Sequence, residues 1–565
     1  MTRNQQELEA KLLGQLRATK EDLIRWEEDP YYMDSATVYK FWDYIRKAPN
    51  IIIVGDYDAD GISATYILGK SIKEQCPDKK LALRIPKRHA EGFGINMNIA
   101  EEIKEKLPKG SLVITVDNGI AAPDVLEDIK AAGYTVIITD HHDLKEDGRI
   151  PNVDMVLNPS VEGVDDAFDG KYWCGAAVAY KLCEQIITKD LRKELESIAG
   201  IASVADCMNL VEGNWGLVRR AIKSFRKLES PRSLNLLLEK MKQDPKFVNT
   251  DTFGFYLGPA FNAAGRLSDE GPNLILKYLF KPSDELADKI IDYNNQRKKL
   301  RDEEYKIIEQ TIAEHNLQEA YPIVVYAPNL HEGIVGILAG KVTENYNAPA
   351  IVFTDSSEEG YIKGSARGVD GFNVFRYLCD NEDLMFKFGG HAGAGGLTIL
   401  KDNLTELQKR QIKVERSSQN IIKESMFIDK EEIPDIIPII EECMPFGEGN
   451  PVPYFTINID IEADKAYFVN GKEPIGEDEL GNPVFPKHLF VNNSMPEAGN
   501  YKITHFFHDP NELNDKNNFL AVGNIFRDGY TKKDTNTTYQ FTTFNTEYIE
   551  DIHSDNLELD NIGGL

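Results

Sequence analysis

The sequence predicts an α/β protein in which a domain with a parallel sheet precedes a long connecting helix, a second α/β domain and a C-terminal β domain. Three observations favour this architecture. From about residue 49 to 280, short apolar runs alternate with helical patterns, as expected for parallel strands joined by helices. Residues 282–320 contain no glycine, which indicates a long helix. After residue 450, β-like stretches alternate with turn residues.

The composition is typical of a soluble globular protein, with 42% hydrophobic and 28% charged residues. We find no apolar run long enough for a membrane helix and no signal-peptide pattern, so we expect a cytoplasmic protein without a membrane partner. The six cysteines lack C-x-x-C spacing, which argues against a zinc site or a disulfide framework. The net charge of −28 restricts any nucleic-acid path to a local basic channel.

The N-terminal 48 residues carry leucines at helical spacing and predict helices without chemistry of their own. The first domain follows, with strands expected at 51–54, 81–85, 112–116, 135–139 and 155–157 and helices at 99–107 and 124–132. In a sheet of this kind, ligands bind beyond the carboxyl ends of the strands.

Carboxylates and histidines follow these strands. Residues 51–61 read I-I-I-V-G-D-Y-D-A-D-G, so three carboxylates at alternate positions leave a buried strand together. Like charges this close repel one another unless a cation lies between them. Later strand ends and one further apolar run add three more carboxylates and two imidazoles. The candidate catalytic residues are Asp56, Asp58, Asp60, Asp117, Asp140, His141, His142 and Asp206.

Carboxylates with one or two imidazoles suit Mn²⁺ or Mg²⁺ better than zinc, and a pair of such ions is a known arrangement for phosphoester hydrolysis. Each residue alone is also compatible with a helix cap or a turn. Their recurrence at successive strand ends favours one shared site.

The motifs resemble a known family. In order, G-D-Y-D-A-D-G (55–61), V-D-N-G (116–119), D-H-H (140–142) and S-V-A-D (203–206) resemble the four motifs of the DHH phosphoesterase superfamily. Four further stretches resemble its branch of single-stranded-DNA-specific exonucleases, which carry a second domain called DHHA1. These stretches are P-K-R-H-A-E-G-F-G (86–94), G-P-A-F-N-A-A-G-R (258–266), G-S-A-R (364–367) and G-G-H-A-G-A-G-G (389–396).

The resemblance implies two divalent cations, Mn²⁺ or Mg²⁺. One would be held by Asp58 with Asp117, and the second by Asp60, Asp117, His141 and Asp206, so that Asp117 bridges them. Asp56 and Asp140 would be extra ligands or would orient an imidazole. His142 would face the scissile phosphate.

The resemblance also implies a pocket for the 5′ end of the substrate, formed by Arg88, Arg266, Ser365 and Arg367, whose side chains are donors suited to phosphate oxygens. The glycine-rich run lets its backbone approach a ligand closely. We therefore expect Gly389, Gly390 and His391 to contact substrate, with His391 on the DNA backbone near the metals. A plain loop with a structural histidine is the alternative.

The remaining boundaries follow from these patterns. About five short strands with interleaved aromatics, at 454–461, 488–491, 501–507, 519–526 and 538–544, fit an OB-like barrel that either stacks bases or only packs. Residues 547–560 carry six acids and no lysine or arginine, which predicts a disordered tail. The expected segments are an N-terminal helical segment (1–48), the DHH catalytic domain (49–280), the connecting helix (281–320), the DHHA1 substrate-binding domain (321–415), a helical joint with the OB-like domain (416–546) and the acidic tail (547–565).

The expected function is 5′ to 3′ exonuclease action on single-stranded DNA in recombination and repair, releasing 5′ mononucleotides. A single-strand-binding protein and a helicase are candidate partners, and we expect a monomer. Two alternatives are a DHH phosphodiesterase acting on short oligonucleotides or cyclic dinucleotides, and a non-catalytic DNA-binding replication scaffold.

Overall fold

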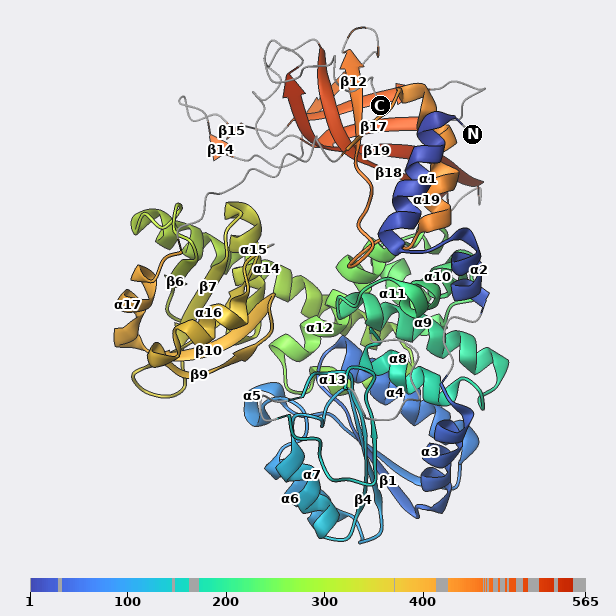
Figure 1. The fold of residues 1–565 in the computed structure, drawn as a ribbon, viewed down its shortest axis with the longest axis vertical. Coiled ribbons are helices and arrows are strands. Elements are labelled where there is room, and N and C mark those ends of the chain that lie inside the picture. Colours follow the sequence, from blue (N-terminus) through green and yellow to red (C-terminus); the bar gives the residue numbers. More distant parts are fainter. Residues whose placement is uncertain are drawn as a thin grey trace.

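A five-stranded parallel sheet forms the centre of the first domain (Figure 1), in the strand order β2-β1-β3-β4-β5. The computed structural model describes residues 2–28, 33–144, 148–161, 172–369, 371–412 and 425–460, residues 462 and 464, and the strands up to residue 551. The strands are β1 (Asn50–Val54), β2 (Lys80–Arg84), β3 (Leu112–Val116), β4 (Thr135–Thr139) and β5 (Met155–Leu157). The predicted parallel sheet is confirmed.

Helices cover both faces of this sheet, because successive side chains of the central strands alternate between two apolar clusters. One cluster packs α4 and α8 against Ile51 and Ile53, and the other packs α6 and α7 against Ile52 and Val54. The helices and turns of this domain are α4 (Ala59–Gln75), α5 (Arg88–Glu91), α6 (Met97–Lys106), α7 (Pro123–Ala131), α8 (Gly175–Cys183), α9 (Lys189–Ala205), α10 (Glu212–Arg226), α11 (Arg232–Lys240), η1 (Pro245–Phe247), η2 (Thr252–Leu257), α12 (Gly258–Leu267) and α13 (Gly271–Phe280).

The predicted connecting segment is one helix, α14 (Asp284–Glu314), whose first turn is capped by the side chain of Ser283. It leads to a mixed sheet in the order β6-β7-β8-β10-β9, with α15 on one face and α16 and α17 on the other. The elements of this second domain are β6 (Ile323–Tyr326), η3 (Glu332–Ile334), α15 (Val335–Tyr346), β7 (Ala350–Asp355), β8 (Tyr361–Arg367), α16 (Val374–Asp380), η4 (Glu382–Leu384), β9 (Met385–Gly390), β10 (Ala394–Leu400), η5 (Lys401–Asn403) and α17 (Leu404–Lys409).

The C-terminal β region is a seven-stranded sheet in the order β11-β12-β18-β19-β17-β16-β13. Two of its strands have 15 residues each and extend well beyond the predicted runs at 519–526 and 538–544. The last strand also contains residues 547–551, so the predicted disorder is wrong there, and the rest of the predicted tail lies outside the described residues. The elements are β11 (Met426–Phe427), η6 (Lys430–Glu432), α19 (Ile433–Cys443), β12 (Phe455–Asp460), β13 (Tyr467–Asn470), β14 (Gly476–Glu477), β15 (Pro483–Val484), β16 (Lys487–Asn493), β17 (Tyr501–Phe506), β18 (Asn518–Lys532) and β19 (Thr537–Asp551).

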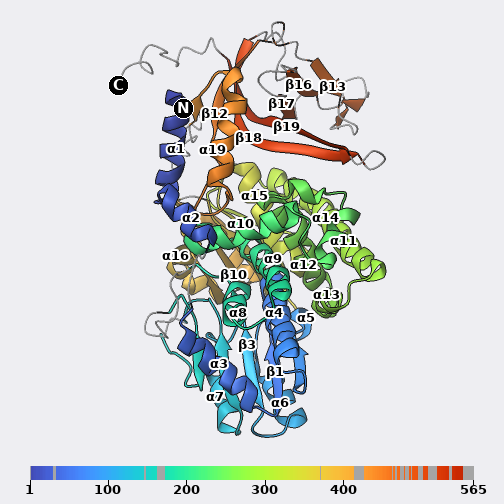
Figure 2. The same cartoon turned by 90° about the vertical axis from the view of Figure 1, so that its right-hand side faces the viewer.

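The N-terminal helices divide between two parts of the molecule. Figure 2 shows α1 (Arg3–Leu16) beside α19, and the leucines of α1 join the apolar cluster of the C-terminal β region. The next helix, α2 (Lys20–Glu28), packs against α10, and α3 (Ser35–Lys47) packs against α8 of the first domain. Among the described helices, none has the length and hydropathy needed to span a bilayer.

Candidate active site

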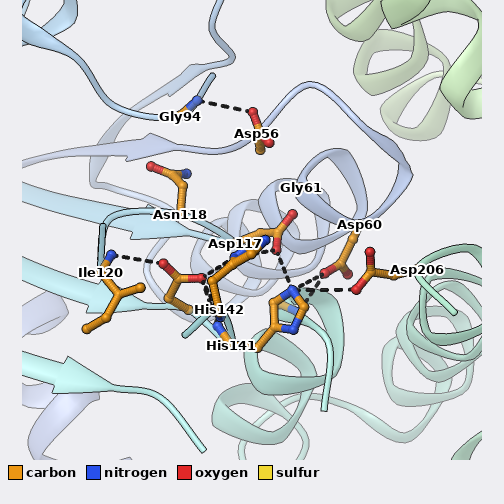
Figure 3. A network of polar contacts seen from close by, with 12 residues as sticks. Asp56, Asp60, Gly61, Gly94, Asp117, Asn118, Ile120, His141, His142 and Asp206 are labelled. Carbon is orange, nitrogen blue, oxygen red and sulfur yellow. Dashed lines mark hydrogen bonds and ion pairs between the residues drawn. The ribbon is translucent and has the colours of Figure 1, made fainter. Parts of the chain in front are cut away.

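Three strand ends and the C-terminal end of α9, where Asp206 lies, bring the predicted carboxylates and imidazoles together (Figure 3). Asp58 caps α4, since its Oδ1 accepts hydrogen bonds from the backbone N–H groups of Asp60 and Gly61 at 3.1 and 3.0 Å. The Oδ1 of Asp56 accepts from the N–H of Gly94 at 3.2 Å. These turns hold the carboxylates where β1 ends.

Asp60 is fixed by a second helix. Its two carboxylate oxygens accept the backbone N–H groups of Gly175 and Ala176, at 2.6 and 2.8 Å, where α8 begins. The free N–H groups of a helix N-terminus favour an anion at this position. Asp60 therefore belongs both to the cluster and to the framework of the domain.

Asp117 lies at the centre of the cluster. It follows β3 with a φ of 59°, and its side chain is 2% exposed. The Nε2 of His141 lies 3.1 Å from the Asp117 Oδ1, 3.6 Å from the Asp60 Oδ2 and 3.5 Å from an oxygen of Asp206. The Asp117 Oδ1 and the His141 Nε2 are both buried without a hydrogen-bond partner, although buried polar atoms normally have one.

Gly175 allows this close approach, because a Cβ atom there would lie 2.5 Å from the Asp117 Cβ. We expect Gly175→Ala to displace Asp117, lowering kcat by about 10²-fold and the free energy of unfolding by about 1–3 kcal/mol. Gly340→Ala is the matched control, since a Cβ there meets no atom within 4 Å. Steady-state kinetics and urea unfolding measure both effects. Unchanged kcat in Gly175→Ala would show that the contact does not position Asp117.

Asp140 positions the histidine pair. Its Oδ1 accepts from the Nδ1 of His142 at 2.8 Å and from the backbone N–H of His141 at 2.8 Å, while its Oδ2 accepts from the N–H of Ile120 at 2.9 Å. Burial opposes a charged His142, but Asp140 outweighs that effect and raises the pKa of His142 to about 10. The His142 side chain is 55% exposed, so a charged donor faces the open side of the cluster.

The fold holds the remaining carboxylates in positions where their charged forms are destabilised. Burial and the charges of Asp60 and Asp58 raise the pKa of Asp117 and of Asp206 well above the usual range of a carboxyl. Burial and the charge of Asp58 raise the pKa of Asp56 to about 7. Divalent cations would compensate these charges and give the orphaned atoms partners, so the residues fit metal ligation. Potential ligand atoms form three groups, namely Asp56–Asp58–Asp117, Asp60–His141–Asp206 and Asp117–His141–His142.

The raised pKa of Asp56 predicts that the stability of the metal-free protein depends on pH. Because the folded-state pKa of Asp56 is raised, its contribution to stability is complete below about pH 4 and is lost as the pH rises toward 7. We expect the free energy of unfolding in EDTA to differ between Asp56→Asn and wild type by an amount that depends on pH. Urea unfolding should show this difference growing by about 2 kcal/mol in favour of Asp56→Asn between pH 5 and pH 8. Mn²⁺ at about 100 times its Kd should stabilise wild type at pH 7.5 by about 2.7 kcal/mol. A constant difference between the two proteins across this pH range would contradict the assignment.

Arg88 and Arg266 form one wall beside the cluster. The Arg88 guanidinium stacks 4.7 Å over the ring of Tyr57, and its Nη1 is buried without a partner. Arg266 donates from Nη1 to the backbone oxygen of Gly333 at 3.3 Å, across to the second domain. Burial and the neighbouring charge of Arg88 lower the pKa of Arg266 to about 10, so an anion here would relieve the repulsion.

Ser365 and Arg367 lie on β8 of the second domain. The Arg367 Nη1 donates to the Ser365 Oγ at 3.0 Å and to the backbone oxygen of Ala366 at 2.8 Å. A Cβ at Gly336 would lie 2.9 Å from the Arg367 Nη2, so the first turn of α15 closes over both side chains. The Arg367 charge acts on Cys207, the sequence neighbour of Asp206, so Arg367 faces the side of the first domain that carries the cluster.

The glycine-rich run is the end of a β-hairpin. Gly389 and Gly390 close β9, and β10 begins at Ala394. The His391 Nδ1 accepts from the N–H of Gly393 at 3.3 Å within this turn, and the ring is exposed. Contact of these three residues with substrate stays a prediction.

Sequence reasoning missed Gly175 and the glycines that open α15. The stretch H-E-G-I-V-G (331–336) carried a signal, since glycines at a helix start can bring backbone N–H groups to a phosphate. Gly175 carried none, because its partner Asp117 is 58 positions earlier in the chain.

Comparisons with known proteins identify the family domains of this chain. The DHH family, N-terminal domain, matches residues 50–209, and the DHHA1 domain matches residues 320–415. The chain is 32% identical to the single-stranded-DNA-specific exonuclease RecJ of Bacillus subtilis over 438 residues, which are 74% of this chain and 53% of that protein. It is 28% identical to RecJ of Escherichia coli over 73% of this chain and 76% of that one. The chain thus spans about half the length of the Bacillus relative.

Solved structures give the same fold. The crystal structure of RecJ from Thermus thermophilus in complex with Mn²⁺ superposes with a TM-score of 0.71 at 19% identity, over 97% of this chain and 78% of that one. A manganese-bound exonuclease RecJ superposes with a TM-score of 0.53 at 26% identity, over 66% and 92%. The predicted fold class is confirmed, with a C-terminal β region present.

Proposed function

Because the chain is a RecJ-like member of the DHH family, we propose that it is a 5′ to 3′ exonuclease that hydrolyses single-stranded DNA to 5′ mononucleotides in recombination and repair. One observation carries this proposal: a buried cluster of carboxylates and imidazoles adjoins Arg88 and Arg266, and Arg266 is hydrogen-bonded to the second domain, which carries Arg367. The first set of groups suits phosphoester hydrolysis, and the second suits a terminal phosphate.

Two divalent cations, Mn²⁺ or Mg²⁺, would occupy the cluster. Asp58 and Asp117, with Asp56 beside them, would hold one ion, and Asp60, Asp117, His141 and Asp206 the other. When bound, such ions supply an activated water and neutralise charge on the phosphate.

The protein's own groups then bind and orient the strand. His142, kept charged by Asp140, donates a hydrogen bond to a non-bridging oxygen of the scissile phosphate. Arg88, Arg266 and Arg367 hold the terminal phosphate, which sets the polarity of degradation. The protein would work as a monomer in the cytoplasm, with a helicase and a single-strand-binding protein supplying its substrate.

The test is Mn²⁺-dependent release of mononucleotides from single-stranded DNA labelled at either end, with duplex DNA and a dinucleotide as controls. We expect early release of label from the 5′ end only, and little from a blunt duplex. Cleavage of the dinucleotide alone would identify a short-oligonucleotide phosphodiesterase. Binding without cleavage would identify a scaffold.

A further inference from the structure

A second basic surface lies where the first domain meets the C-terminal β region. A cavity of about 430 Å³ there is lined by Arg226, Lys246, Phe247, Glu441 and Arg527, and an adjoining cavity of about 220 Å³ shares Arg226 and Glu441. We call this pair of cavities the seam cleft. Arg226 ends α10, whose first residue comes soon after Asp206, and a helix of 15 residues spans about 22 Å. The seam cleft is therefore separate from the carboxylate cluster.

The charges of the seam cleft do not cancel. Among the described residues that line it, five have cationic side chains, namely Arg219, Lys223, Arg226, Lys246 and Arg527, and one, Glu441, has a carboxylate. Nearby, Glu27 pairs with Arg219 at 2.8 Å and with Lys223. Lys246 also has an interaction partner. Cationic groups of the described lining residues still outnumber the carboxylates of Glu441 and Glu27, in a protein whose net charge is −28.

Among the described residues, no carboxylate forms an ion pair with Arg226. Its Nε donates to the backbone oxygen of Val248 at 2.9 Å, which fixes the guanidinium group. Glu441 is the carboxylate that acts on it, but Arg527 already holds both oxygens of Glu441, at 2.8 and 3.0 Å. A fixed, partly buried guanidinium between two other arginines favours a planar anion such as phosphate.

We propose that the seam cleft binds phosphate groups through Arg226 and Lys246. Two ligands could supply such a phosphate group. One is a phosphodiester of a DNA strand that extends beyond the 5′-end pocket, and the other is a free mononucleotide. The cavity volume falls in the range of small-ligand pockets, and Phe247 adds an apolar wall against which a base or sugar can pack. The strand source rests on the proposed function, whereas the mononucleotide source does not.

The test measures binding by the full chain in EDTA, so that it does not depend on hydrolysis. Fluorescence anisotropy compares oligothymidylates of about 30 and about 4 nucleotides at several salt concentrations. Arg226→Met keeps the aliphatic length without the charge, and the exposed neighbour Lys227→Met is the matched control. We expect Arg226→Met to raise the Kd of the long strand about three- to tenfold and to reduce the salt slope by about 0.7, with the short strand unaffected.

Calorimetry with thymidine monophosphate distinguishes the two sources. Weaker binding of the mononucleotide by Arg226→Met, with an unchanged Kd for the long strand, would assign the cleft to a free nucleotide. If neither Kd changes in a folded variant, the proposal is overturned. Lys246→Gln provides the same test if Arg226→Met unfolds. Absence of nuclease activity in wild type would reject the proposed function and leave these binding results intact.

Discussion

Asp117→Asn is expected to lower kcat for single-stranded DNA by at least about 10³-fold. Asp117 belongs to two of the three groups of potential metal ligands and lies 3.1 Å from His141, so its loss affects both expected ion positions. Asparagine is the better substitution because it tolerates the φ of 59° that alanine would adopt under strain. Initial rates of mononucleotide release measure the effect.

The same variant should behave differently in unfolding experiments. Without metal, Asp117→Asn removes a buried charge repelled by Asp60 and Asp58, so we expect the free energy of unfolding at pH 7.5 to rise. The stabilisation by Mn²⁺ should fall or vanish. Asp124→Asn is the matched control, since that exposed carboxylate forms only a surface ion pair. More than about a tenth of wild-type kcat in Asp117→Asn would exclude a bridging role.

Arg367→Ala is expected to reduce kcat/KM about 10- to 100-fold on a strand with a 5′ phosphate. The two hydrogen bonds within β8 orient the guanidinium toward the start of α15, where a phosphate would receive donors from both. On a strand with a 5′ hydroxyl the loss should be small, because the bonds removed are those to the phosphate.

The comparison of the two 5′ ends separates recognition from damage to the fold. Arg376→Ala is the control, since Arg376 is an exposed arginine of α16 in the same domain, with 79% of its side chain accessible. Arg367→Lys should recover part of the loss, because a lysine keeps the charge without the bidentate geometry. Equal losses on both substrates would mean that Arg367 supports the domain and not the terminal phosphate.

The carboxylate cluster could be predicted from the sequence because parallel strands end at the same edge of their sheet. That rule placed Asp60, Asp117 and His141 together without any distance information, and the His141 Nε2 lies 3.6 Å from an oxygen of Asp60 and 3.1 Å from an oxygen of Asp117. The role of Asp140 was left open between ligand and orienting group. Its hydrogen bonds to the His142 ring and to three backbone N–H groups favour orientation, a distinction that depends on rotamers and not on spacing.

The C-terminal β region was predicted least well. Apolar runs predicted five short strands, but β18 and β19 have 15 residues each, pair over almost their whole length and include polar positions that no periodicity marks. Strand length there is set by the partner strand, so tertiary pairing overrides local pattern. Likewise, the close contact of Gly175 with Asp117 depends on how α8 packs and has no local signature.

The packing of α1 against α19 has a consequence for synthesis on the ribosome. Leu8, Leu12 and Leu16 are buried against a helix that begins at Ile433, so they emerge more than 400 residues before their partner exists. Chains grow at about 5–20 residues per second, so these leucine side chains stay exposed to water for tens of seconds before α19 has been synthesised. The first domain can fold during that interval, but the N-terminal helix must be protected, by a chaperone or by transient contacts, until the last part of the chain is made.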